Sequence, residues 1–316
     1  MTAPTSHRTA VRGAQPDPAG VGFCLFAAIA WGTTGTAATF APGVPAVAIG
    51  AAAMGIGGLL QALLALSGMR AHRSGLWRNR ANMLAGGIAV AIYPLAFYAS
   101  MRLAGVTIGT VISLGSAPLI SALIENRLEG SRLTPRWSVG AAIGLAGMAL
   151  LSLGEGGHAA GNGVAGRDVA LGGLLGLVAG GTYALYSWTA RRMMHDGLSS
   201  RVAMGATFGV GGILLMPVLI ATGAPFLDAP GNLAVGLYMA LVPMFFGYIA
   251  FGQGLSRVSA SLATTITLFE PVVAAVLAVV IVGERLPARG WLGVALIVVC
   301  LIWTTAPLPR RRRLAV

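Results

Sequence analysis

The sequence predicts an all-α integral membrane protein of ten transmembrane helices, arranged as two inverted five-helix repeats. Three observations predict this fold. Apolar residues make up 56% of the 316 residues and charged residues only 9%, which is too little polar surface for a soluble globule of this length. Ten apolar segments approach the length of a membrane span. A run in the second quarter of the chain also recurs in the last quarter.

The ten segments follow from the thickness of the bilayer. A hydrocarbon core about 30 Å thick requires about 20 residues of helix. The first 19 residues are polar, and the apolar run after them is too long for a signal-peptide core and is followed by no small-residue cleavage site, so it is predicted to be the first span. The predicted helices cover 20–40, 44–67, 82–101, 105–125, 137–154, 168–190, 202–222, 231–252, 258–283 and 290–307.

The repeat defines the domain organisation. Sliding the run 118–142 forward by 153 positions superimposes eight identical residues, among them Pro118 on Pro271 and Gly130 on Gly283, where chance gives about two. Because five helices is an odd number, the second repeat enters the membrane inverted relative to the first. The predicted divisions are an amino-terminal tail 1–19, a repeat 20–154, a linker 155–167, a repeat 168–307 and a basic tail 308–316.

The basic residues predict the orientation and exclude nucleic acid as a partner. All 21 are arginines and most lie in breaks between apolar runs, so lipid phosphates are their expected partners. With the amino terminus inside, 17 arginines lie on the inner side and four on the outer side. This bias predicts a multi-pass protein of the inner (cytoplasmic) membrane with both termini in the cytoplasm. No nucleic-acid-binding motif is visible.

Glycine and cysteine have structural explanations. Many of the 46 glycines lie within the predicted helices, where small residues let helices pack closely in lipid. Cys24 and Cys300 both lie in apolar runs and are interpreted as buried hydrophobes, not as a disulfide or a metal site.

Three short stretches resemble a known family: Ala30-Trp31-Gly32-Thr33 in the first span, Leu268-Phe269-Glu270-Pro271-Val272 in the ninth, and Gly283-Glu284-Arg285-Leu286 before the tenth. With the duplicated layout, they resemble the EamA-type branch of the drug/metabolite transporter superfamily over roughly residues 20–307. The resemblance implies a ten-helix inner-membrane carrier, often an exporter of amino acids and other metabolites, with a central cavity between the repeats.

The chain departs from that family in two places. An arginine frequent early in the family's second helix is missing, because 46–66 carries no charge, and Ser131 stands where the second repeat has Glu284.

Glu270 is the sharpest candidate site residue. It is the only acidic residue of its apolar run and lies about halfway along the ninth helix, where a charge costs several kcal/mol unless it is protonated, paired or wetted. It could bind a substrate amine, or take up a proton and couple transport to the proton gradient. The alternative is a protonated carboxyl that hydrogen-bonds a neighbouring helix.

Aromatic side chains on other helices are candidates to complete a pocket around Glu270. Trp31 and Tyr183 occupy similar places in the first helices of the two repeats, and Tyr93 corresponds to Phe246. Rings at such positions could stack on a ligand or close its exits, although interfacial anchoring explains Tyr and Trp near helix ends equally well. The candidates are Trp31, Tyr93, Phe97, Tyr98, Tyr183, Tyr186 and Tyr248.

Two further pairs have candidate roles. Pro118 and Pro271 lie at matching positions of the repeats and are predicted hinges, although shared ancestry alone would also preserve them. Glu284 and Arg285, before the tenth helix, would form an external gate or charged vestibule, or else a helix cap with a local ion pair.

These features predict a secondary transporter that moves a small metabolite (an amino acid, amine or related compound) by alternating access, as an exporter, with protons as a candidate coupling partner. Desolvation disfavours a polyanionic substrate. No phosphate-cradling loop or HExxH motif is present, so neither an enzyme nor a cofactor is predicted. A channel-like facilitator and a non-transporting sensor or assembly subunit remain as alternatives.

Overall fold

The computed structural model describes residues 16–155 and 166–306, and nearly all of them lie in helices. Ten helical segments are long and apolar enough to cross a membrane within these ranges, which confirms the predicted ten-helix fold. They are Pro18–Ala38, Ala46–Ala71, Arg80–Ala104, Ile108–Glu129, Pro135–Leu153, Arg167–His195, Ser200–Thr222, Pro230–Leu255, Ala260–Val282 and Ala288–Thr305.

The helices of the first repeat are long and mostly uninterrupted. The first span breaks at Thr33, whose hydroxyl donates to the carbonyl of Ala30 at 2.7 Å. The elements are α1 (Pro18–Gly32), α2 (Thr34–Ala38), α3 (Ala46–Ala71), α4 (Arg73–Arg78), α5 (Arg80–Ala104), α6 (Val106–Glu129) and α7 (Pro135–Glu155).

The second repeat is interrupted in its third and fourth spans. The eighth span changes to a π-helix, η3, and the ninth contains a 3₁₀ turn, η4, and ends in a second π-helix, η5. The elements are α8 (Gly166–His195), α9 (Ser200–Thr222), η2 (Ala224–Leu227), α10 (Pro230–Met239), η3 (Ala240–Phe246), α11 (Gly247–Leu255), α12 (Ala260–Ile266), η4 (Thr267–Phe269), α13 (Glu270–Leu277), η5 (Ala278–Val282) and α14 (Ala288–Thr305).

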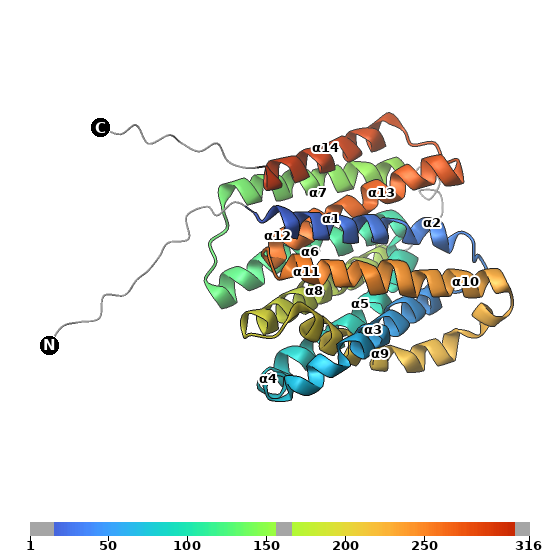
Figure 1. The fold of residues 1–316 in the computed structure, drawn as a ribbon. Coiled ribbons are helices and arrows are strands. Elements are labelled where there is room, and N and C mark those ends of the chain that lie inside the picture. The colour runs from blue at the N-terminus through green and yellow to red at the C-terminus, as the bar shows by residue number, and fades with distance from the viewer. Residues whose placement is uncertain (1–15, 156–165, 307–316) are drawn as a thin grey trace, which may run out of the picture.

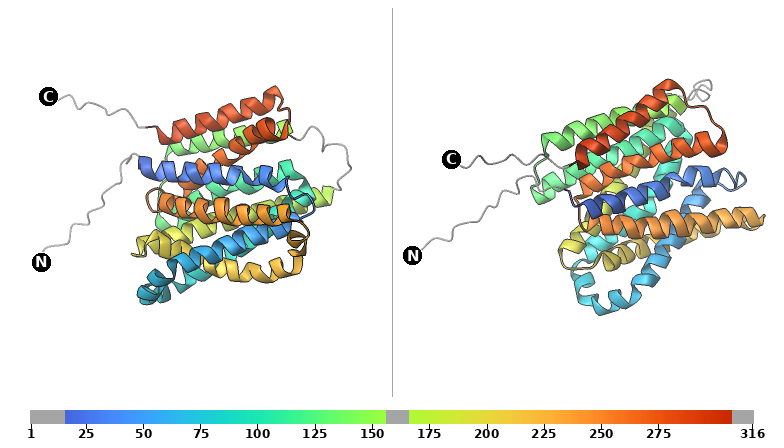
Figure 2. Two further views of the ribbon diagram at one scale, coloured as in Figure 1. Left: turned by 45° about the vertical axis from the view of Figure 1, so that its right-hand side comes forward. Right: turned by 45° about the horizontal axis from the view of Figure 1, so that its top comes forward.

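The packing follows the internal duplication. α3 packs on its repeat mate α9, and α7 on its mate α14, while α5 packs on α8 as α1 packs on α11. Figure 2 shows α7 and α14 paired at one side of the bundle and α3, α4 and α9 at the other. α1 begins and α14 ends at the same end of the bundle, called here the near end; the opposite end is the far end (Figure 1).

Small residues permit these close crossings, as the glycine content predicts. A Cβ on Gly212 of α9 would lie 2.8 Å from the carbonyl oxygen of Gly55 on α3. Because lipid supplies no hydrophobic drive between helices, such close backbone approach is a main source of packing energy.

Candidate substrate cavity

A cavity lies between the two repeats, with the carboxyl group of Glu270 in its wall. About 550 Å³ free of protein atoms lies within it and in the open space at its mouth. Helices of both repeats contribute. Its lining consists of Trp31, Thr34, Gly50, Ala53, Met54, Tyr93, Pro94, Phe97, Tyr98, Tyr183, Met239, Met244, Tyr248 and Glu270.

The cavity occupies the far half of the bundle. Trp31 lies at the end of α1, which starts at the near end, and Gly50 lies near the start of α3, which starts at the far end. Tyr98 is likewise in the last part of α5, and Met239 ends α10. The lining therefore extends from mid-span toward the far end.

Glu270 is placed by a break in the ninth span. The 3₁₀ turn η4 precedes it, and Glu270 is the first residue of α13, with Pro271 next to it. Proline has no backbone N–H, so it fits the start of a helix without losing a hydrogen bond. The Glu270 side chain is half-buried, and among the described residues it makes no ion pair or direct hydrogen bond. A carboxyl group at this depth without a protein partner is available to a ligand or a proton.

Aromatic rings pack together at the near side of the cavity. The repeat-related Trp31 and Tyr183 are in edge-to-face contact, with ring centroids 6.3 Å apart at 78°. Tyr248 lies 4.6 Å from the Trp31 ring, and Phe251 lies 5.2 Å from it. Tyr186 is fully buried behind them, with its hydroxyl 2.8 Å from that of Tyr248. This cluster closes the cavity toward the near end.

The π-helix η3 fixes the orientation of Trp31. The indole N–H of Trp31 donates to the carbonyl of Pro243 at 2.9 Å, and the amide of Gln61 donates to the next carbonyl, Met244, at 3.3 Å. A π segment disrupts the regular i to i−4 ladder and is common at functional sites. Side chains from the first and second spans thus donate hydrogen bonds to backbone carbonyls of the π-helix.

Gly32 brings α1 against the helix that carries Glu270. A Cβ at this position would lie 2.5 Å from the Cβ of Val273 and 2.7 Å from the carbonyl oxygen of Glu270. The glycine of the Ala30-Trp31-Gly32-Thr33 stretch therefore has a specific packing role.

We expect Gly32→Val to displace α1 from α13, destabilising the protein by about 1–3 kcal/mol through overpacking and reducing transport at least about tenfold by moving Trp31. Thermal melting in detergent and flux in liposomes measure the two effects. Gly22→Val is the matched control, because Gly22 is on the same helix with nothing within 4 Å of an added Cβ. Equal behaviour of the two variants would contradict the role given to Gly32.

The structure brings together most of the aromatic residues singled out in the sequence. Trp31, Tyr93, Phe97, Tyr98, Tyr183 and Tyr248 line the cavity with Glu270, and Tyr186 packs directly behind it. Phe246, the repeat mate of Tyr93, is 53% exposed instead.

The two predicted hinge prolines lie in different local structures, and the predicted gate residues lie outside the cavity. Pro118 lies inside the unbroken α6, whereas Pro271 follows the 3₁₀ turn. Glu284 and Arg285 lie in the exposed connection between η5 and α14, and neither lines the cavity. In the described part of the chain they form no ion pair with each other.

Several functional candidates carry no sequence signal. Met54, Met239 and Met244 line the cavity, but apolar residues in apolar spans cannot be distinguished from lipid-facing ones by composition. Glu125 does carry a sequence signal. It is buried at the near end of α6, and its position as an acid at the end of a predicted apolar run could have identified it as a candidate.

The fold and cavity define a duplicated helical membrane transporter. The sequence profile of the EamA-like transporter family matches residues 18–153 and again 170–306. The chain belongs to this family.

Individual relatives agree with this assignment. The chain is 33% identical over 294 residues to an uncharacterized transporter, YwfM, of Bacillus subtilis, covering 93% of this chain and 95% of the relative. It is 26% identical over 277 residues to a probable terminal-alkyne amino-acid exporter of Streptantibioticus cattleyicolor, covering 84% and 89%. A solved crystal structure has the same fold, with a TM-score of 0.74 at 21% identity over 90% of this chain and 96% of that one.

Proposed function

We propose that this transporter is a secondary carrier that exports a small metabolite bearing an amino group, such as an amino acid or amine, by alternating access. The observation that carries the proposal is the carboxyl group of Glu270, which has no protein partner among the described residues and faces an aromatic cavity between two inverted repeats. A protonated amine can pair with the carboxylate and lie against the rings of Trp31 and Tyr93 through cation–π attraction.

Alternating access is supported by the position of the cavity. The lining lies in the far half of the bundle, and the aromatic cluster fills the near side. Inverted repeats supply two related arrangements in which one end is closed while the other is open. A continuous pore, which a channel needs, is not supported by this packing.

The membrane, orientation and direction belong to the same proposal. The arginine bias of 17 to four supports the cytoplasmic membrane with both termini inside, so that the far end faces outward. Export is supported by the name of the Streptantibioticus relative. Protons are the proposed coupling ion, with Glu270 as their carrier.

The test begins with a thermal-shift screen of amino acids, amines and purines on the purified protein, followed by counterflow of the labelled hit in liposomes. A carrier gives saturable counterflow, and cells overproducing it retain less of the labelled compound. Linear, unsaturated flux would contradict the proposal in favour of a channel, and absence of flux in favour of a sensor or assembly subunit.

A further inference from the structure

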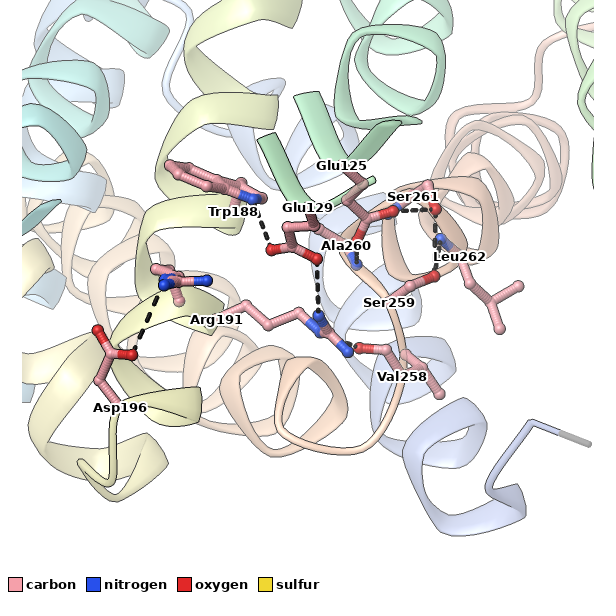
Figure 3. A network of polar contacts seen from close by, with 11 residues as sticks. Glu125, Glu129, Trp188, Arg191, Asp196, Val258, Ser259, Ala260, Ser261 and Leu262 are labelled. Carbon is pink, nitrogen blue, oxygen red and sulfur yellow. Dashed lines mark hydrogen bonds and ion pairs between the residues drawn. The ribbon is translucent and has the colours of Figure 1, made fainter. Parts of the chain in front are cut away.

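The near end of the bundle is tied together by a polar network that is separate from the cavity. Glu125, on α6, is only 4% exposed. Its carboxylate accepts hydrogen bonds from the backbone N–H of Ala260 at 2.6 Å and of Ser261 at 3.3 Å, and from the Ser261 hydroxyl at 2.5 Å (Figure 3). It thus caps the start of α12, the helix that leads through η4 to Glu270.

A second carboxylate, one helical turn further along α6, extends the network. Glu129 accepts a hydrogen bond from the indole of Trp188 at 2.8 Å and lies 3.9 Å from Arg191, both on α8 (Figure 3). Arg191 also donates to the carbonyl of Val258 at 2.8 Å, in the connection before α12. The Glu129 and Arg191 side chains are only 17% and 16% exposed, so solvent screens their attraction weakly.

The contacts of both carboxylates cross between the repeats, whereas the hydrogen bond from Arg191 to Val258 lies within the second. α6 belongs to the first repeat, whereas α8 and α12 belong to the second. Opening a path from the cavity to the near end separates helices of the two repeats, and the buried Glu125 would then lose three donors at once.

Among the described residues, the far end has no equivalent network. The offset of 153 positions pairs Glu125 and Glu129 with Ala278 and Val282, and the offset of 152 that pairs Trp31 with Tyr183 pairs Arg191 with Thr39. The alanine and valine side chains can neither form an ion pair nor accept a hydrogen bond, and the threonine carries no charge. Within 16–155 and 166–306, the network of Glu125, Glu129 and Arg191 is therefore present at one end, although the fold is duplicated.

We propose that Glu125, Glu129 and Arg191 form a latch that holds the near end closed and biases the carrier toward the state open at the far end. The inference rests on the proposed alternating access: the latch must break, with Glu125 leaving the start of α12, each time the site turns to the near end. A one-sided latch of this kind sets which state the empty carrier occupies.

The test measures distances between spin labels in nanodiscs, without any substrate. One label pair replaces the exposed Ser131 and Ser256, which lie on different repeats at the near end; a second replaces the exposed Arg102 and Val282 at the far end. Both are built in a background with Cys24 and Cys300 replaced by Ala. With the latch residues unmodified, the near-end label pair is expected to give one narrow distribution of distances. Glu125→Gln with Glu129→Gln is expected to add a population longer by about 5 Å or more.

Asp196→Asn is the matched control, because it breaks an exposed pair with Arg192 at the same end but within one repeat. An unchanged near-end distribution in the double variant, or an equal change in the control, would overturn the latch. If the double variant does not fold, Ser261→Ala removes only one donor to Glu125 and must still lengthen the near-end distribution. If the distance between the near-end labels lengthened while the distance between the far-end labels did not shorten, the result would support the latch and contradict alternating access.

Discussion

Replacing Glu270 by Gln is expected to abolish pH-driven transport, with a loss of at least about 100-fold in the initial rate. Gln has nearly the same size but can neither take up a proton nor carry the charge that pairs with an amine. Since no hydrogen bond or ion pair of Glu270 exists among the described residues, the substitution removes no structural contact there, and the protein should fold. Uptake of the screened ligand into liposomes with and without a pH gradient measures the effect.

Asp228→Asn is the control for Glu270→Gln, because Asp228 is an exposed acid between η2 and α10 and does not line the cavity. It is expected to keep both the rate and the response to the gradient. A Glu270→Gln protein that is still driven by the gradient as the unmodified protein is would defeat the coupling role. Unchanged ligand affinity in that variant would defeat the amine-binding role.

Trp31→Ala is expected to destabilise the protein by about 3–5 kcal/mol and to lower its melting midpoint by about 5–10 °C. The side chain is 4% exposed and is in ring contact with Tyr183, Tyr248 and Phe251. Removing the Trp31 ring leaves a void at the near side of the cavity. The aromatic cluster there also loses the ring that the other three contact. Transport should fall along with stability, because Trp31 lines the same cavity as Glu270.

Trp31→Phe separates the two contributions of the indole. It keeps most of the ring packing but removes the hydrogen bond to the Pro243 carbonyl in η3, at a cost of about 0.5–1.5 kcal/mol. Its melting midpoint is therefore expected between those of the unmodified protein and Trp31→Ala. If Trp31→Phe melted as low as Trp31→Ala, ring packing would not be the main contribution of Trp31 to stability.

Most of the fold could be predicted because bilayer thickness and desolvation are strong constraints. Apolar length located all ten spans to within a few residues, and the match of Pro118 with Pro271 revealed the duplication. The same physics singled out Glu270, because an acid at mid-span is strongly disfavoured unless it has a role there. The repeat placed Trp31 and Tyr183 at related positions, and their rings are in contact, whereas Phe246, the repeat mate of Tyr93, is exposed.

Local irregularities of the second repeat could not be predicted. No local pattern predicts the π segments η3 and η5, and η3 has tertiary partners, Trp31 and Gln61, that lie far away in the sequence. Equivalent prolines also have different surroundings: α6 continues through Pro118, while Pro271 begins a helix after a 3₁₀ turn. The role of Glu125 depends on the start of α12, 135 residues away in the sequence.

A substrate site between the repeats is tested most directly by an experimental structure of the protein with the screened ligand bound. We expect density for the ligand between Glu270, Trp31 and Tyr93, with its amino group within hydrogen-bonding distance of the Glu270 carboxyl. Ligand density elsewhere in the bundle, or side chains filling the space beside Glu270, would contradict this site.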